Sequence, residues 1–241
     1  MCDPGSPVKP GSGPQPACAR WRATTLGATT EALEQRLIVE LVGRVDGRRI
    51  LDLGCGDGLL AARMAARGAR VVGLDLDGAM LAAATSRAVP ATGRPPRFVQ
   101  GRIESLPFPA SAFDAVVAVA VLCVVPGHEA AVREAVRVLR PGGRLVIGDL
   151  GRWSTWAAGR RVRGWRGSPV WRAAHFWTAS DELSRLVGRA GMTVIAVRGS
   201  VYYPPIGFLA RALGTLDRWL GPWTTIGAAF VAVAAVRSPK R

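Results

Sequence analysis

Apolar residues fall along the chain in two kinds of pattern that alternate with each other. Short, mostly apolar runs are typical of parallel strands buried on both faces, whereas apolar side chains three and four residues apart indicate helices that cover a sheet. The predicted strands comprise residues 49–53, 70–75, 97–100, 115–120, 144–150, 192–198 and 227–236. The predicted helices comprise residues 30–42, 59–68, 77–84, 129–139 and 178–191, with a shorter amphipathic piece at 209–220. This alternation predicts an α/β fold.

The chain divides into a tail and one domain. Residues 1–20 are rich in proline and glycine, and the first residues lack the cationic and apolar leader of a signal peptide. We therefore expect a disordered tail. The remaining residues, 21–241, have the length of a single α/β domain of ordinary size.

A glycine-rich turn follows the first predicted strand and reads Asp-x-Gly-x-Gly-x-Gly, with the glycines at Gly54, Gly56 and Gly58. Such a turn brings a ligand close to bare backbone NH groups at the positive end of the next helix. The dinucleotide signature requires its third glycine at the position of Leu59, and no Gly-Lys-Ser/Thr phosphate loop follows. The carboxylate of Asp52 would repel a pyrophosphate but suits a ligand that carries an ammonium group.

This turn resembles motif I of the class I S-adenosylmethionine-dependent methyltransferases. Residues 101–108, Gly-Arg-Ile-Glu-Ser-Leu-Pro-Phe, and the Phe-Asp pair at 113–114 resemble a block of the ubiquinone and menaquinone methyltransferases, the type 11 branch. Residues 137–147, Arg-Val-Leu-Arg-Pro-Gly-Gly-Arg-Leu-Val-Ile, give a third match. The three motifs span roughly residues 49–150 in the correct order and spacing, so a chance coincidence of all three is improbable.

The resemblance implies a fold and an activity. The fold is a single Rossmann-like, doubly wound domain whose seven-stranded sheet is mostly parallel, with the last strand antiparallel. The activity is methyl transfer from S-adenosyl-L-methionine to a small-molecule or lipid-like acceptor by in-line displacement. Residues 49–150 would form the cofactor-binding core, and residues 151–226 would contain insertions on the acceptor side.

The resemblance also implies which residues bind the cofactor. The carboxylate of Asp52 is expected to meet the methionyl ammonium group. Asp75 lies 21 residues after Gly54, at the end of the second strand, where it can accept hydrogen bonds from both ribose hydroxyls. Asp77 is expected to cap the following helix, which leaves Asp75 for the ligand. The full set of candidates is Asp52, Gly54, Cys55, Gly56, Gly58, Asp75, Leu76, Arg102, Ile103 and Ala118.

Arg102 departs from the family pattern. Related sequences usually place an aspartate there, which accepts from the adenine amino group, and arginine has no acceptor. Adenine recognition must then depend on the backbone around Ile103, on stacking against apolar side chains, or on another acid such as Glu104. The substitution also leaves open a protein that binds the cofactor without catalysis.

Methyl transfer requires a base only if the acceptor must lose a proton. His175 is the candidate catalytic residue, because it lies among Trp171, Phe176 and Trp177 in the connection where this fold usually builds its acceptor pocket. Packing among those aromatic rings is the alternative role. We expect His128 to cap a helix or face solvent, and Cys123 to be a small buried residue.

The same connection is rich in arginine and tryptophan and contains no acid between Asp149 and Asp181. Its members are Arg152, Arg160, Arg161, Arg163, Arg166 and Arg172, with Trp153, Trp156, Trp165, Trp171 and Trp177. This arginine and tryptophan segment could contact an anionic membrane, stack on nucleic acid, or line a pocket for an acidic aromatic acceptor. The alternative is a solvated basic helix whose buried face includes Trp153, Trp156 and Ala157.

The net charge bears on nucleic acid as a partner, and the cysteines bear on metal sites and disulfides. The formal net charge of +15 favours an RNA methyltransferase as the alternative enzyme, although an Asn-Pro-Pro-Tyr-type motif is absent and nucleic acid is the less favoured partner. The four cysteines show no C-x-x-C spacing, so neither a metal site nor disulfides are expected. We expect a cytoplasmic protein that is peripheral to the membrane at most, because Gly221-Pro222 interrupts the uncharged stretch at 219–236. The sequence does not indicate an oligomeric state.

Overall fold

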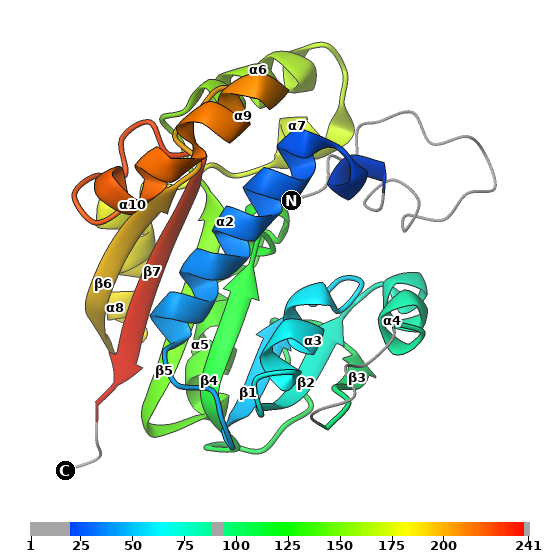
Figure 1. The fold of residues 1–241 in the computed structure, drawn as a ribbon. Helices are drawn as coiled ribbons and strands as arrows, with labels where there is room; N and C mark the ends of the chain where they lie inside the picture. Colours follow the sequence, from blue (N-terminus) through cyan, green and yellow to red (C-terminus); the bar gives the residue numbers. More distant parts are fainter. Residues whose placement is uncertain (1–19, 88–93, 239–241) are drawn as a thin grey trace.

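The computed structural model describes residues 20–87 and 94–238 and is centred on one seven-stranded sheet (Figure 1). The strands are β1 (Arg49–Leu53), β2 (Arg70–Asp75), β3 (Arg97–Gln100), β4 (Phe113–Val119), β5 (Leu139–Leu150), β6 (Met192–Ser200) and β7 (Phe230–Arg237). Their order is β3-β2-β1-β4-β5-β7-β6. Strands β1 to β5 pair in parallel, whereas β7 is antiparallel to both β5 and β6. The predicted fold class is therefore confirmed.

Helices cover both faces of this sheet (Figure 1). They are α2 (Thr25–Val42), α3 (Leu59–Ala65), α4 (Gly78–Thr85), α5 (His128–Val138), α6 (Thr155–Trp165), α7 (Pro169–Ala173), α8 (Ser184–Arg189), α9 (Gly207–Leu213) and α10 (Asp217–Leu220). One apolar cluster joins α2 and α3 to one face, and a second joins α5 and α8 to the other. Ile50 and Leu51 alternate between the two clusters, so the central strand is buried on both faces.

The parallel pairing places the carboxyl ends of β1, β2, β4 and β5 at one edge of the sheet, the upper edge in Figure 1. The glycine turn after β1 and the loops after β4 and β5 therefore meet there. In open α/β sheets, ligands bind outside this edge.

Several element boundaries differ from the prediction, and three of the differences have a clear local cause. Helix α2 begins five residues early, because the Thr24 hydroxyl caps it by accepting from the Gly27 NH at 3.0 Å. Strand β5 begins at Leu139 instead of residue 144, since residues 140–143 form a bulge in the pairing with β4, in which Gly142 has φ of 73°. The helix predicted over residues 178–191 opens with a wider π turn (Ala179–Leu183), which lets the Thr178 NH donate to Glu182 Oε2 at 3.0 Å and the Glu182 NH donate to Thr178 Oγ1 at 3.3 Å.

The predicted tail, residues 1–20, lies outside the described residues except for Arg20, which is helical. In the part of the chain that the structure describes, no helix has both the length and the apolar composition needed to cross a bilayer. The uncharged stretch at 219–236 contributes the end of α10, a loop and most of β7.

Candidate active site

The glycine turn after β1 has the backbone conformation that its sequence predicts. Gly54, Gly56 and Gly58 have φ of 67°, 53° and 73°, in the left-handed region that glycine adopts without strain. A Cβ at Gly54 would lie 2.6 Å from the Val121 side chain, and one at Gly58 would lie 2.8 Å from Phe98. A Cβ at Gly56 would meet nothing within 4 Å. The middle glycine therefore borders open space that a ligand can enter.

Asp52, at the end of β1, is a buried carboxyl group that lacks a full set of partners. Its side chain is only 2% exposed, and its Oδ2 atom has no hydrogen-bond partner among the described residues. Burial, followed by the charge of Asp75, raises the pKa of Asp52 to about 8. A cationic group placed against Oδ2 would supply the missing partner, so the site fits the ammonium group of S-adenosylmethionine.

Asp75 connects the glycine turn to the neighbouring strand. Its Oδ2 accepts from the Gly56 NH at 2.8 Å and its Oδ1 accepts from the Asp77 NH at 3.0 Å. The Asp77 side chain caps α4 by accepting from the Ala79 NH at 2.8 Å, as the sequence predicted. A carboxylate oxygen has a second lone pair, so Asp75 can still accept from two ligand hydroxyls. Leu76 beside it is 58% exposed.

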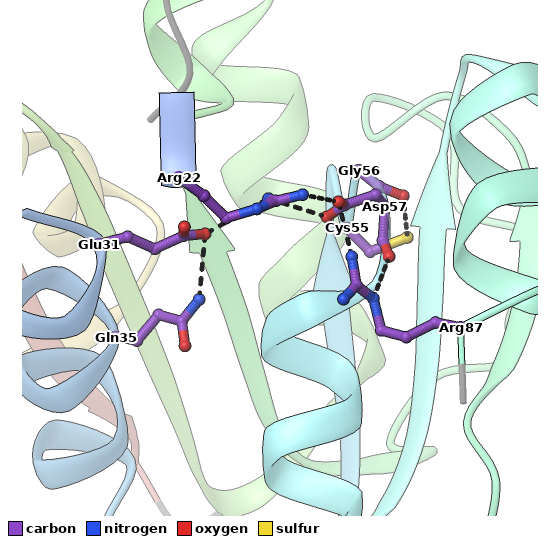
Figure 2. Close-up of polar contacts among 7 residues, drawn as sticks. All are labelled: Arg22, Glu31, Gln35, Cys55, Gly56, Asp57 and Arg87. Atoms are coloured by element: carbon purple, nitrogen blue, oxygen red, sulfur yellow. Dashed lines mark hydrogen bonds and ion pairs between the residues drawn. The ribbon is translucent and has the colours of Figure 1, made fainter. Parts of the chain in front are cut away.

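An ion-pair cluster that the sequence did not reveal lies across the glycine turn (Figure 2). The Asp57 carboxylate binds the guanidinium groups of Arg22, which precedes α2, and of Arg87, which follows α4. Arg87 also donates from Nε to the Asp57 carbonyl at 2.9 Å. Glu31 lies 3.6 Å from Arg22 and accepts from Gln35 at 3.2 Å. The two arginines are 35 and 30 residues from Asp57, so no local pattern signals the pairing.

A cavity of about 200 Å³ lies between this cluster and the strand ends. Its lining is Arg22, Glu31, Glu34, Gln35, Ile38, Asp52, Gly54, Cys55, Gly56, Asp57, Leu59, Leu60, Met80, Val119 and Ala120. Four of the predicted cofactor residues, Asp52, Gly54, Cys55 and Gly56, are among them. Gly58 ends the turn against Phe98, and Asp75 holds the turn by accepting from the Gly56 NH. Helix α2 and Arg22, three residues before it, supply a further wall, and none of their residues was among the predicted cofactor residues.

The remaining predicted cofactor residues lie outside that lining. Ala118 and Ile103 are buried, at 3% and 5% exposure. Arg102 is exposed, and its Nη2 donates to Glu104 Oε1 at 3.0 Å. The nearest alternative acid for adenine is therefore engaged by the residue that replaces the usual aspartate.

His175 lies on the connection that follows β5, between α7 and the π turn at Ala179–Leu183. Its backbone NH donates to the Cys123 carbonyl at 2.8 Å, and Cys123 lies three residues after Ala120 of the cavity. The Nε2 atom of His175 is buried, has no hydrogen-bond partner among the described residues, and is 4.0 Å from Glu182 Oε2. Burial lowers the pKa of His175 below its usual value, so at neutral pH the ring is uncharged.

The rings around His175 differ from the predicted set. Trp177 is adjacent, with ring centroids 4.2 Å apart, but Trp171 and Phe176 belong to a separate apolar cluster with Cys123. His128 takes their place, its ring centroid 5.3 Å from that of His175. His128, which we expected to cap a helix or face solvent, is the first residue of α5; it is partly exposed, and its ring also contacts Trp177. Cys123 is buried, as expected.

The arginine and tryptophan segment forms α6 and α7 and divides into buried and exposed members. Trp156 and Trp171 are buried and flank the Arg160 guanidinium, which lies 5.3 Å and 4.9 Å from their ring centroids. Trp153 and Trp165 are 62% and 81% exposed. The prediction that these residues form a buried helix face is therefore confirmed for Trp156 and Ala157 and is wrong for Trp153.

The sequence matches a family model described as a methyltransferase domain over residues 51–147. The chain is 35% identical to a ubiquinone biosynthesis O-methyltransferase of Idiomarina loihiensis over 170 residues, which cover 68% of this chain and 69% of the relative. It is 39% identical to the 27-O-demethylrifamycin SV methyltransferase of Amycolatopsis mediterranei over 128 residues, which cover 51% of this chain and 47% of the relative.

The crystal structure of a methyltransferase from Thermotoga maritima has the same fold. It superimposes with a TM-score of 0.70 at 20% identity over 91% of this chain and 94% of the other. The open glycine turn, the unpartnered oxygen of Asp52 and the extent of the similarity to curated relatives agree. The chain therefore belongs to the family of S-adenosylmethionine-dependent methyltransferases and is an enzyme that uses S-adenosylmethionine as its cofactor.

Proposed function

We propose that this enzyme transfers a methyl group by in-line displacement to an oxygen atom of a small-molecule or lipid-like acceptor. The observation that carries the proposal is the buried, unpartnered Oδ2 of Asp52 beside an open glycine turn. The oxygen acceptor is inferred from the names of the two curated relatives, both of which act at oxygen on small organic molecules.

The cofactor is held by residues that the sequence predicted. Asp52 accepts from the methionyl ammonium group, and Asp75 accepts from the ribose hydroxyls. The backbone of Gly54, Cys55 and Gly56 lines the cavity, and Gly58 ends the same turn against Phe98. Leu76, Ile103 and Ala118 supply apolar and backbone contacts, while Arg102 fixes Glu104. When bound, S-adenosylmethionine supplies an activated methyl group, so the protein's contribution is positioning.

His175 is the base for a hydroxyl acceptor. Its lowered pKa leaves Nε2 free to accept the hydroxyl proton at neutral pH, while the acceptor oxygen forms its bond to the methyl carbon. The bond between that carbon and the donor sulfur breaks, and the sulfur keeps the electron pair. The imidazolium that results lies 4.0 Å from the Glu182 carboxylate, which stabilises its charge.

The membrane is the proposed location of the acceptor. Trp153 and Trp165 are exposed, and so are Phe208, Trp219 and Trp223 on and after α9. The connection from residue 150 to residue 180 contains six arginines and no acid, and exposed aromatic rings with cationic side chains are the combination that binds anionic bilayers. We propose a cytoplasmic enzyme that contacts such a bilayer peripherally.

A labelled methyl donor tests the function. The purified enzyme is incubated with methyl-labelled S-adenosylmethionine and separate cell fractions of lipid, polar small molecules and RNA. We expect label in the lipid or small-molecule fraction and its loss in the Asp75→Ala variant. Label in RNA alone would establish the alternative enzyme, and cofactor binding without label in any fraction would indicate a protein that binds without catalysis.

Vesicle co-sedimentation tests the membrane contact. Retention on anionic vesicles should exceed retention on neutral vesicles and decrease with salt, because exposed charges are screened within about 10 Å at 0.1 M ionic strength. Equal retention on both vesicles, or none on either, would assign the exposed tryptophans another role.

A further inference from the structure

The amino ends of the first strands carry a group of arginines that the methyl transfer reaction does not use. Arg49, Arg70 and Arg97 are the first residues of β1, β2 and β3, and Arg94 lies three residues before β3. The parallel register places Arg49 opposite Arg70 and Val72 opposite Arg97. The four residues line one pocket at the amino ends of these strands, although they are separated by up to 48 residues in sequence. Figure 1 shows this end of the sheet as its lower edge.

These arginines surround a cavity of about 400 Å³. Its apolar lining consists of Val71, Val72, Pro95 and Phe113. Volumes of roughly 300 to 1,000 Å³ with mostly apolar walls and a few polar groups are usual for sites that bind small molecules. The cavity thus combines a hydrophobic floor with four guanidinium groups.

No carboxylate of the described residues forms an ion pair with any of the four guanidinium groups. Asp114, which follows Phe113, does not line the cavity. Its oxygens accept from the Arg140 guanidinium at 2.6 Å and from the Arg49 backbone NH at 2.7 Å. None of the four side-chain charges is therefore neutralised by an ion pair within the described residues.

We propose that this arginine-lined cavity binds a phosphorylated small molecule with an apolar or planar body, such as a nucleotide. Guanidinium groups bind phosphate oxygens through paired hydrogen bonds, and several of them together favour a ligand with more than one negative charge. The hydrophobic floor accepts the uncharged part of the ligand. A single carboxylate or an uncharged lipid would leave most of the guanidinium groups without a partner.

The cavity is distinct from the methyl transfer site. Strand β1 runs from Arg49, at the cavity, to Leu53, just before the glycine turn. Four residue steps of about 3.3 Å place the two ends about 13 Å apart. The bound molecule is therefore neither the cofactor nor the acceptor, and the proposal does not depend on the proposed function.

Calorimetry tests the proposal on the full chain with S-adenosylhomocysteine at saturation, so that the cofactor site is filled. The probes are uridine triphosphate, inorganic pyrophosphate and, as the uncharged control, uridine. We expect both phosphates to bind, uridine triphosphate more tightly, and uridine not to bind. The Arg70→Gln/Arg97→Gln variant should weaken uridine triphosphate binding by about tenfold or more, equivalent to about 1.4 kcal/mol or more.

The matched control is Arg133→Gln/Arg185→Gln, which removes the same charge from exposed positions on α5 and α8. It should retain binding within about twofold. Arg94→Gln lies outside any strand or helix and provides a variant that leaves the sheet undisturbed. Absence of phosphate binding, an equal loss in the control, or binding of single-stranded RNA alone would each overturn the proposal.

Discussion

Asp52 and Asp149 are the second-to-last residues of β1 and β5, and both are buried, yet their bonding differs. Both oxygens of Asp149 accept backbone NH groups, from Cys123 at 2.9 Å and from Leu150 at 2.8 Å. Oδ2 of Asp52 has no partner among the described residues. Burial raises the pKa of Asp149 to about 6 and that of Asp52 to about 8.

The comparison separates two uses of a buried acid. Asp149 fixes the loop after β4, and with it the Cys123 carbonyl that holds His175. Each of its oxygens has a hydrogen-bond partner without a ligand. In Asp52, by contrast, Oδ2 has no hydrogen-bond partner among the described residues. A buried polar atom without a partner indicates a place where a ligand can bind. Burial alone would not have distinguished the two residues.

The largest expected effect is on the cofactor end. Asp75→Ala removes the ionised acceptor that we place against the ribose hydroxyls, and it should weaken S-adenosylmethionine binding by roughly 2 to 4 kcal/mol while the fold remains intact. Asp77→Ala is the matched control, since it removes the cap of α4 and should cost about 1 kcal/mol of stability. Calorimetry that gave the same affinity for Asp75→Ala and the parent would remove Asp75 from the site.

The next effect is on the acceptor end. With an acceptor that must lose a proton, His175→Ala should lower kcat by about 100-fold and leave cofactor affinity nearly unchanged. Because the pKa of His175 is lowered, the rate of the parent enzyme should decrease only at pH values below the usual pKa range of histidine. The His175→Ala variant should not show this decrease at acidic pH. A variant with the full rate and an unchanged pH profile would show that His175 only packs beside Trp177.

A third prediction compares how the two buried acids contribute to the stability of the fold. Asp149→Asn replaces one acceptor with a donor opposite a backbone NH, so the free energy of unfolding should decrease by about 1 to 3 kcal/mol. Asp52→Asn should leave stability unchanged or raise it, while it weakens cofactor binding. Denaturant titration measures both, and an equal loss in the two variants would contradict the distinction.

A further prediction concerns the pH dependence of stability. An acid whose pKa is raised on folding favours the folded state while it is protonated, so its contribution is lost as pH rises from the unfolded value to the folded one. For Asp52 this window extends from about 4 to about 8, and for Asp149 it ends at about 6. Asp52→Asn should therefore flatten the stability profile between pH 6 and 8, whereas Asp149→Asn should not.

Proton release provides a second measurement of the same group. If Asp52 ionises to meet the ammonium group, cofactor binding below about pH 8 releases a proton. Calorimetry in buffers of different ionisation enthalpy should detect it in the parent and not in Asp52→Asn. A release that persists in the variant would assign the proton to another residue.

The cofactor end could be predicted because its determinants are local. The glycines of the turn, the cap at Asp77 and the strand bounds of β1 to β3 follow from neighbouring residues, and the structure has them. The arginines that hold Asp57 come from 30 and 35 residues away, so the turn sequence could not indicate them.

The acceptor end depends on distant partners, and its prediction was accordingly poorer. Trp156 is buried because its Nε1 atom donates to the Tyr203 carbonyl at 2.8 Å, 47 residues away. Trp153 lies three residues before Trp156 and four before Ala157, which is helical spacing, but it precedes α6 and is exposed. The ring that replaces Trp171 beside His175 belongs to His128, on another helix. Helical spacing defines a face, but it does not define what that face meets.

The position of β7 has a consequence for the synthesis of the protein. This strand lies between β5 and β6, although it is the last of the three to be translated. Strand β6 therefore has no partner in the sheet until residue 237 has emerged from the ribosome, and β5 keeps an open edge until then. The nascent chain exposes two apolar strand edges for the time needed to translate about 40 residues, several seconds at 5 to 20 residues per second. Chaperone dependence should therefore be concentrated late in translation, after the cofactor core has been made.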